Sequence, residues 1–148
     1  MIKNILYSVL ATLISLTTYA SDVRQLETDD GYVIHYNTFI TNFLTAEVAR
    51  SYNIQRSKKR AMLNISVRKI GKDKLAQTTA APATVTVTAS NFIGQAKTIE
   101  IRRIDEQDAI YYIADFTIAN QEKVKFNLQV TPDGKTHKIQ FEQQFFVD

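Results

Sequence analysis

The chain has 148 residues, of which 18 are basic and 15 acidic, and it contains no cysteine. It can therefore form neither a disulfide nor a thiolate metal site, and it cannot carry a lipoprotein anchor at a cleavage point. Four glycines are too few for a phosphate-binding loop, and no serine-hydrolase elbow or zinc-protease motif occurs. The composition thus predicts a protein without catalytic residues, metal or cofactor.

The first twenty residues, MIKNILYSVLATLISLTTYA, have the three parts of a secretory signal peptide. Lys3 gives a positive start, an apolar run follows, and Thr18-Tyr19-Ala20 has the small residues of a cleavage site. The apolar run is shorter than the roughly 20 residues that a transmembrane helix needs. We therefore expect cleavage after Ala20, a periplasmic location, no membrane span in the mature chain, and a single domain over residues 21–148.

From Gly31 onward, apolar and polar residues alternate with the period of β-strands. Seven segments show this alternation: 32–40, 61–69, 83–91, 98–104, 109–118, 122–130 and 137–147. Regular spacing with short turns predicts an immunoglobulin-like antiparallel β-sandwich. Its expected core includes Val124, Phe126, Leu128, Val130, Ile139, Phe141 and Phe145.

Two turns stand out among the connections. Asn120-Gln121 has the length of a tight hairpin turn, and Thr131–Lys135 contains the proline and glycine that such turns favour.

The segment 46–52 is the only helix that the mature chain predicts. Thr45 is a plausible N-cap, and Asn53 suits the left-handed conformation that ends a helix. Val48 and Tyr52 lie one turn apart and are expected on its buried side.

The run RSKKR, Arg56–Arg60, lies between this helix and the next strand. Between Arg50 and Lys74 there are nine basic residues and one acidic residue. A polyanion site needs converging cations and interleaved aromatics, whereas this turn has only Tyr52 nearby. A solvated turn is favoured, an anionic envelope surface or partner protein comes second, and nucleic acid and a protease signal are disfavoured.

Within the run, two roles are separable. Arg56 and Ser57 are candidate anchors of the turn, because they can bond to local backbone groups. Lys58, Lys59 and Arg60 form a candidate patch for an anionic surface.

A few side chains outside the run are candidates for binding. His35 and Asn37 share one face of the first strand, and Asn64 and Tyr111 lie on later strands. A histidine there can titrate or bind a ligand, but a hydrogen-bonded structural histidine is favoured. His137 is expected to be exposed, and Tyr111-Tyr112 to pack at core and edge rather than bind sugar.

Many polar and apolar positions together resemble the domain-of-unknown-function family 4426. The matching positions are His35-Tyr36-Asn37, Phe39, Phe43-Leu44-Thr45, Glu47-Val48-Ala49, Tyr52, Ile54, Arg56-Ser57-Lys58, Leu63–Val67, Asn91, Gly94-Gln95, Ala109–Ile113 and Gln144-Phe145. Ala46 departs from the pattern, where the family has proline. The resemblance implies a small exported β-rich protein of Gram-negative bacteria and implies no activity.

Three functional hypotheses remain open. The favoured one is a non-catalytic protein-interaction or envelope-accessory module, with an envelope protein as partner. The second is a small-ligand carrier or hydrolase with a pocket near His35, Asn37, Arg56 and Asn64. The third is a peripheral binder of an anionic envelope surface.

Overall fold

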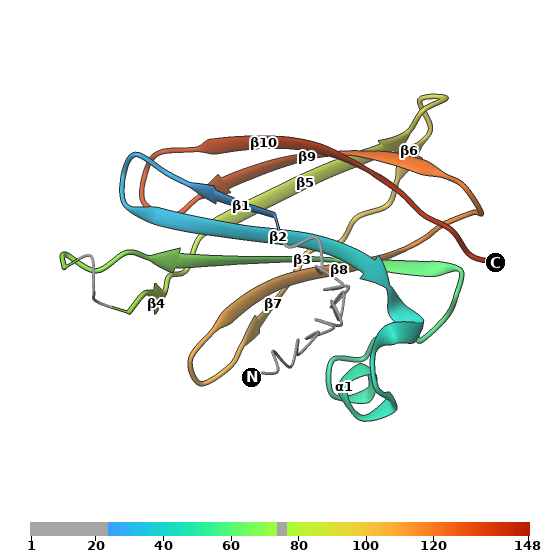
Figure 1. The fold of residues 1–148 in the computed structure, drawn as a ribbon, viewed down its shortest axis with the longest axis horizontal. Coiled ribbons are helices and arrows are strands. Elements are labelled where there is room, and N and C mark those ends of the chain that lie inside the picture. The colour runs from blue at the N-terminus through green and yellow to red at the C-terminus, as the bar shows by residue number, and fades with distance from the viewer. Residues whose placement is uncertain (1–23, 74–76) are drawn as a thin grey trace, which may run out of the picture.

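The computed structural model describes residues 24–73 and 77–148, which form two antiparallel sheets (Figure 1). The expected signal peptide, its cleavage site and Lys74 lie outside the described residues. In the first sheet the strand order is β1 (Arg24–Glu27), β2 (Tyr32–Ile40), β3 (Arg60–Lys69), β8 (Ile110–Thr117) and β7 (Arg102–Asp105), with β4 (Thr79–Ala80) paired to the end of β3. In the second sheet it is β10 (His137–Gln144), β9 (Lys123–Thr131), β5 (Thr84–Asn91) and β6 (Ala96–Lys97).

The antiparallel β-sandwich predicted from the sequence is confirmed. All seven predicted strands are present, and β1, β4 and β6 are short additions of four, two and two residues. The seven predicted strands can be lettered A to G in chain order. Their spatial order is then A-B-E-D in the first sheet (β2-β3-β8-β7) and G-F-C in the second (β10-β9-β5), which is the order in immunoglobulin-type sandwiches.

The core lies between the two sheets and consists of the inward residues of the alternating strands. Phe126 is fully buried, its ring centroid is 4.8 Å from that of Phe141, and Phe116 meets it edge-on at 5.6 Å. All seven predicted core residues of β9, β10 and the segment after β10 are buried. The register pairs Phe141 with Phe126, which brings the two inward rows of β9 and β10 side by side.

Three connections run between the sheets, namely β4–β5, β6–β7 and β8–β9, and the last two bear on the predictions. The turn at Asn120-Gln121 is tight, with Gln121 at φ 60°, but it links β8 of the first sheet to β9 of the second. The predicted strand 98–104 begins only at Arg102, because the chain leaves β6 of the second sheet and crosses to β7 of the first. Alternation predicts extended chain in both places but cannot tell which sheet the chain joins.

One excursion interrupts the sandwich between β2 and β3. It contains a 3₁₀ turn η1 (Thr41–Phe43) and the helix α1 (Ala46–Ser51). The Thr45 hydroxyl accepts the Val48 amide at 3.2 Å, and Asn53 has φ 52°, so both predicted ends are confirmed. No helix in the described ranges is long and apolar enough to cross a membrane.

Candidate functional site

The outer face of the first sheet carries most of the candidate residues. Along β3 the inward residues Leu63 and Ile65 are fully buried in the core, so Arg60, Met62 and Asn64 point the other way. The register places Asn37 and Ile113 on either side of Asn64. It likewise places His35 and Tyr111 on either side of Ser66, so four predicted site residues (His35, Asn37, Asn64 and Tyr111) share this face.

Helix α1 covers part of this face and leaves an apolar groove of about 250 Å³ between itself and the sheet. The groove is lined by Leu44, Val48, Tyr52, Met62, Asn64, Ile104, Tyr111 and Ile113. Beneath it, Ala49, Ile54, Met62 and Ile113 form a hydrophobic cluster separate from the inter-sheet core. The prediction that Val48 is buried is wrong: the small side chain of Ala49 packs inward, and Val48 is 38% exposed at the groove.

A hydrogen bond from Tyr52 fixes the far side of the helix. The Tyr52 hydroxyl donates to Glu106 Oε1 at 2.5 Å, which joins the end of α1 to the turn between β7 and β8. This bond with the carboxylate raises the pKa of Tyr52 above its ordinary value. The C-terminal end of the helix is thus tied to the β7–β8 turn while the groove stays open.

The wall of the groove contains one polar atom without a partner. The Asn64 side-chain oxygen Oδ1 is buried and accepts no hydrogen bond from any described residue. A buried acceptor without a donor costs about 1–3 kcal/mol. A molecule that entered the groove with an N–H or O–H group would satisfy it.

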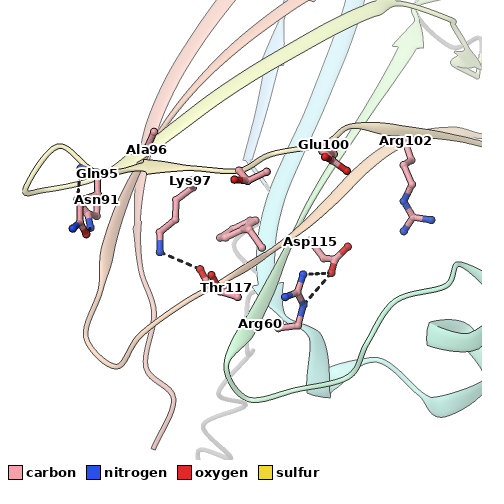
Figure 2. A pocket seen from close by; sticks show the side chains of 11 residues that line it. Arg60, Asn91, Gln95, Ala96, Lys97, Glu100, Arg102, Asp115 and Thr117 are labelled. Carbon is pink, nitrogen blue, oxygen red and sulfur yellow. Dashed lines mark hydrogen bonds and ion pairs between the residues drawn. The ribbon is translucent and has the colours of Figure 1, made fainter.

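A second hollow is a charged cleft of about 490 Å³ (Figure 2). It is lined by Arg60, Asn91, Gln95–Thr98, Glu100, Arg102 and Asp115–Thr117. Two of its cations are already paired. The Arg60 guanidinium donates to Asp115 at 2.5 and 3.0 Å, and Lys97 bonds both the Glu122 carboxylate and the Thr117 carbonyl.

Arg102 is the exception among the cations of the cleft. It is half-buried on β7, directly across from Ile113 of the groove, and no described residue forms a hydrogen bond or ion pair with its guanidinium. Glu100 is exposed nearby in the cleft, but no ion pair joins the two. Arg102 therefore offers an unneutralised, planar cation at the boundary of the apolar groove.

The boundary between cleft and groove crosses three neighbouring strands obliquely, because the register shifts it by two residues from each strand to the next. On each strand a charged residue of the cleft is followed two residues away, on the same face, by an apolar residue of the groove. These pairs are Arg60 and Met62 on β3, Asp115 and Ile113 on β8, and Arg102 and Ile104 on β7. The two hollows are one surface with a charged half and an apolar half.

His35 does not form a catalytic pair. It lies beside Ser66 in the register, but among the described residues no hydrogen bond links the two side chains. Burial, and secondarily the nearby Arg68 cation, lower the pKa of His35 below its ordinary value of 6.5, so the neutral imidazole is favoured. No carboxylate in the described ranges is bonded to this ring, and a nucleophile-base-orienter set is not assembled there.

The second histidine occupies a different place from the one predicted. His137 was expected to be exposed, but only 9% of its side chain is accessible, and its Nε2 lies 3.0 Å from Asp30. The neighbouring Asp29 carboxylate bonds Lys135 at 2.6 Å, which lowers the pKa of Asp29. These contacts join the β1–β2 turn to the β9–β10 hairpin, a pairing that distant sequence positions do not reveal.

Arg56 and Ser57, the candidate anchors in the RSKKR run, lie close to Thr41, which was not among the residues predicted to be important. Thr41 is fully buried, and its hydroxyl lies 2.8 Å from the Gln55 carbonyl and accepts the Ser57 amide at 2.9 Å. Arg56 is exposed and donates to the Asn42 carbonyl at 3.3 Å. The Ser57 hydroxyl accepts the Lys59 amide at 3.0 Å. Arg56 and Ser57 thus form local hydrogen bonds at the base of the turn, whereas His35 and Asn37 lie on the outer face of β2.

The candidate anionic-surface patch divides into two parts. Lys58 and Lys59 are exposed, whereas Arg60 is held by Asp115 in the charged cleft. Alternation from Ala61 onward was a usable signal here, because it places Arg60 on the outer face of β3 beside Met62. The partner of Arg60, Asp115, is 55 residues away, so no local sequence pattern could have predicted this ion pair.

These observations define the class: an antiparallel β-sandwich with an open apolar groove on one outer face. The family model for the domain of unknown function DUF4426 matches residues 26–148, and the chain belongs to this family.

Among solved structures, the chain is similar to a DUF4426 family protein from Pseudomonas aeruginosa PAO1. The two are 29% identical with a TM-score of 0.72, over 88% of this chain and 99% of that chain. The GAE domain of GGA2p from Saccharomyces cerevisiae is 7% identical, with a TM-score of 0.40 over 83% of this chain and 96% of that chain. No curated protein matches the chain.

Proposed function

We propose that the protein is a non-catalytic protein-binding module, exported to the periplasm, that uses the outer face of its first sheet to hold a segment of a partner protein. The segment would place a large apolar side chain in the groove and a carboxylate on Arg102. The observation that carries this proposal is the boundary on β3, β7 and β8, where charged and apolar residues adjoin on one face.

The size of the groove favours a side chain over a free small molecule. Its volume of about 250 Å³ lies below the roughly 300–1,000 Å³ typical of small-molecule sites. Partner proteins, by contrast, commonly anchor one aromatic or aliphatic side chain in a pocket of this kind. The charged cleft is larger, but its lining is mostly polar and two of its cations are paired, unlike the mostly apolar lining of small-molecule sites.

Charge complementarity sets the chemistry of the partner. Arg60 is neutralised by Asp115, so the open charge at the boundary is the Arg102 guanidinium. A guanidinium matches a carboxylate in two parallel hydrogen bonds. A backbone amide of the bound segment would also satisfy Asn64 Oδ1.

A displayed peptide library tests this chemistry directly. Selection on the wild-type protein should enrich peptides with Asp or Glu close to Phe, Leu or Met. Selection on Arg102→Glu should enrich Lys or Arg at the charged position, and Ile104→Asp should abolish enrichment by placing a charge in the groove. As a matched control, Thr86→Asp on β5 of the second sheet should leave the wild-type selection unchanged.

Two outcomes would contradict the proposal. One is no enrichment on the wild-type protein; the other is an enriched set that Arg102→Glu and Ile104→Asp both leave unaltered. Native mass spectrometry of the purified protein separates the small-ligand alternative, since a co-purifying molecule of a few hundred daltons that Ile104→Asp displaces would favour a carrier.

A further inference from the structure

The most exposed large apolar side chains of the described residues lie outside the strands. Phe43 is 78% exposed in η1, Phe92 and Ile93 are 59% and 79% exposed in the β5–β6 turn, and Phe146 is 57% exposed after β10. The next most exposed, Val48 and Leu26, reach only 38% and 37%. Single exposed apolar residues are ordinary, but four side chains that are each more than half exposed indicate an interaction surface if they lie together.

All four lie at one end of the sandwich. The register pairs Ile40 with Ala61 in the first sheet, and Asn91 with Val124 and Gln144 with Lys123 in the second. The ends of β2, β5 and β10 and the beginnings of β3 and β9 therefore meet at the same end, to the right in Figure 1. We call this the aromatic end, comprising Phe43, Phe92, Ile93 and Phe146.

Lysines accompany these rings. Lys58 lines a shallow hollow together with Phe43 and Phe146, and the Lys123 ammonium lies 5.6 Å from the centroid of the Phe92 ring. Lys59 is exposed beside Lys58. One carboxylate, Asp148, also lines that hollow, and it accepts a hydrogen bond from the Asn120 side chain at 2.7 Å.

The rings project from separate segments: η1, the β5–β6 turn and the chain after β10. A rigid protein partner needs a packed, continuous surface, whereas a lipid interface is fluid and surrounds each projecting ring separately. Apolar side chains such as Phe and Ile are stabilised when they leave water for the headgroup–acyl boundary of a bilayer, and lysines beside them are attracted to anionic lipids. We infer that the aromatic end inserts its ring tips into the surface of an anionic lipid bilayer, with Lys58, Lys59 and Lys123 against the headgroups.

The chain has no tryptophan, which allows a local optical test. Phe43→Trp, Phe92→Trp and Phe146→Trp would each carry a single tryptophan at the aromatic end. With vesicles of phosphatidylcholine and phosphatidylglycerol (three to one), each should show a blue-shifted emission maximum. Leu26→Trp, on β1 near the opposite end, is the control and should show no shift, and it also separates this contact from any made by the N-terminal segment.

Co-sedimentation with the same vesicles tests the contributions of rings and charges. Phe43→Ser with Phe146→Ser, and separately Phe92→Ser with Ile93→Ser, should each weaken binding at least tenfold. Lys58→Glu with Lys59→Glu should weaken binding more than Lys69→Glu with Lys72→Glu, an equal charge change at the opposite end. Binding should fall between 50 and 500 mM NaCl and be weaker to pure phosphatidylcholine.

The inference is overturned by tryptophan emission that stays unshifted at all three positions. It is also overturned if the two lysine pairs act alike, because net charge alone would then explain binding. Blue shifts caused by a purified envelope protein in the absence of lipid would instead assign the aromatic end to a protein partner.

Discussion

The sandwich has two hydrophobic clusters, and they differ in how completely their residues are buried. Between the sheets, eighteen buried residues pack together, and Phe126, Val124 and Val130 are inaccessible to solvent. Beneath α1, only four residues are buried, and the surrounding Leu44, Tyr52, Ile104 and Tyr111 are partly exposed around a groove. The inner cluster holds the fold, while the outer one leaves apolar surface in contact with water, as a binding face does.

The largest expected effect lies in the inner cluster. Phe126→Ala removes a ring that contacts Phe116 and Phe141, and it should lower the free energy of unfolding by about 3–5 kcal/mol. Urea denaturation followed by circular dichroism measures it. Phe92→Ala removes the same atoms from an exposed position and should change stability by less than about 0.5 kcal/mol. Equal losses in the two variants would contradict the contrast between buried and exposed rings.

A smaller effect is expected where the outer cluster is tied to the sandwich. Thr41→Val keeps the shape but leaves the Ser57 amide and the Gln55 carbonyl without the hydroxyl, which should cost about 1–3 kcal/mol. Hydrogen exchange should accelerate in residues 42–57 before it does in β9. Thr41→Ser retains the hydroxyl and should exchange nearly as the wild type does; uniform acceleration across the chain would show that the two clusters are not separable.

The smallest effect concerns His35 on the outer face. Its pKa is lowered in the folded state, so below pH 6.5 the unfolded chain binds a proton that the folded protein does not. Stability should therefore be complete above pH 6.5 and decline as pH falls from 6.5 towards the folded pKa. His35→Gln should flatten this decline in denaturation curves taken between pH 7.5 and 5. A variant with the wild-type slope would assign the decline to other groups.

Local patterns were enough to predict most of the fold. Strand β2 matches the predicted segment 32–40 residue for residue, because its alternation is set by burial on the inner side. The caps Thr45 and Asn53 were equally local. What failed depends on partners distant in sequence: Asn120-Gln121 changes sheets, and His137 is covered by the turn containing Asp30.

The candidate site was predicted in part. Asn64 and Tyr111 line the groove as members of the outer face, whereas Arg56 lies at the base of the turn. Arg102 was missed because a single arginine within an expected strand looks ordinary. Its importance comes from its neighbour Ile113 on β8 and from the absence of a carboxylate partner among the described residues.

The hydroxyl of Thr41 has a consequence for how this surface can change. It joins the two ends of the segment 41–57, so the helix and its loop are closed at their base by one side chain. A segment closed in this way can accept different lengths and sequences between its ends while β2 and β3 keep their register. The segment between Thr41 and Ser57 can therefore be replaced by another loop without changing the two sheets. Such a graft is a route to a protein with altered binding specificity on the same sandwich.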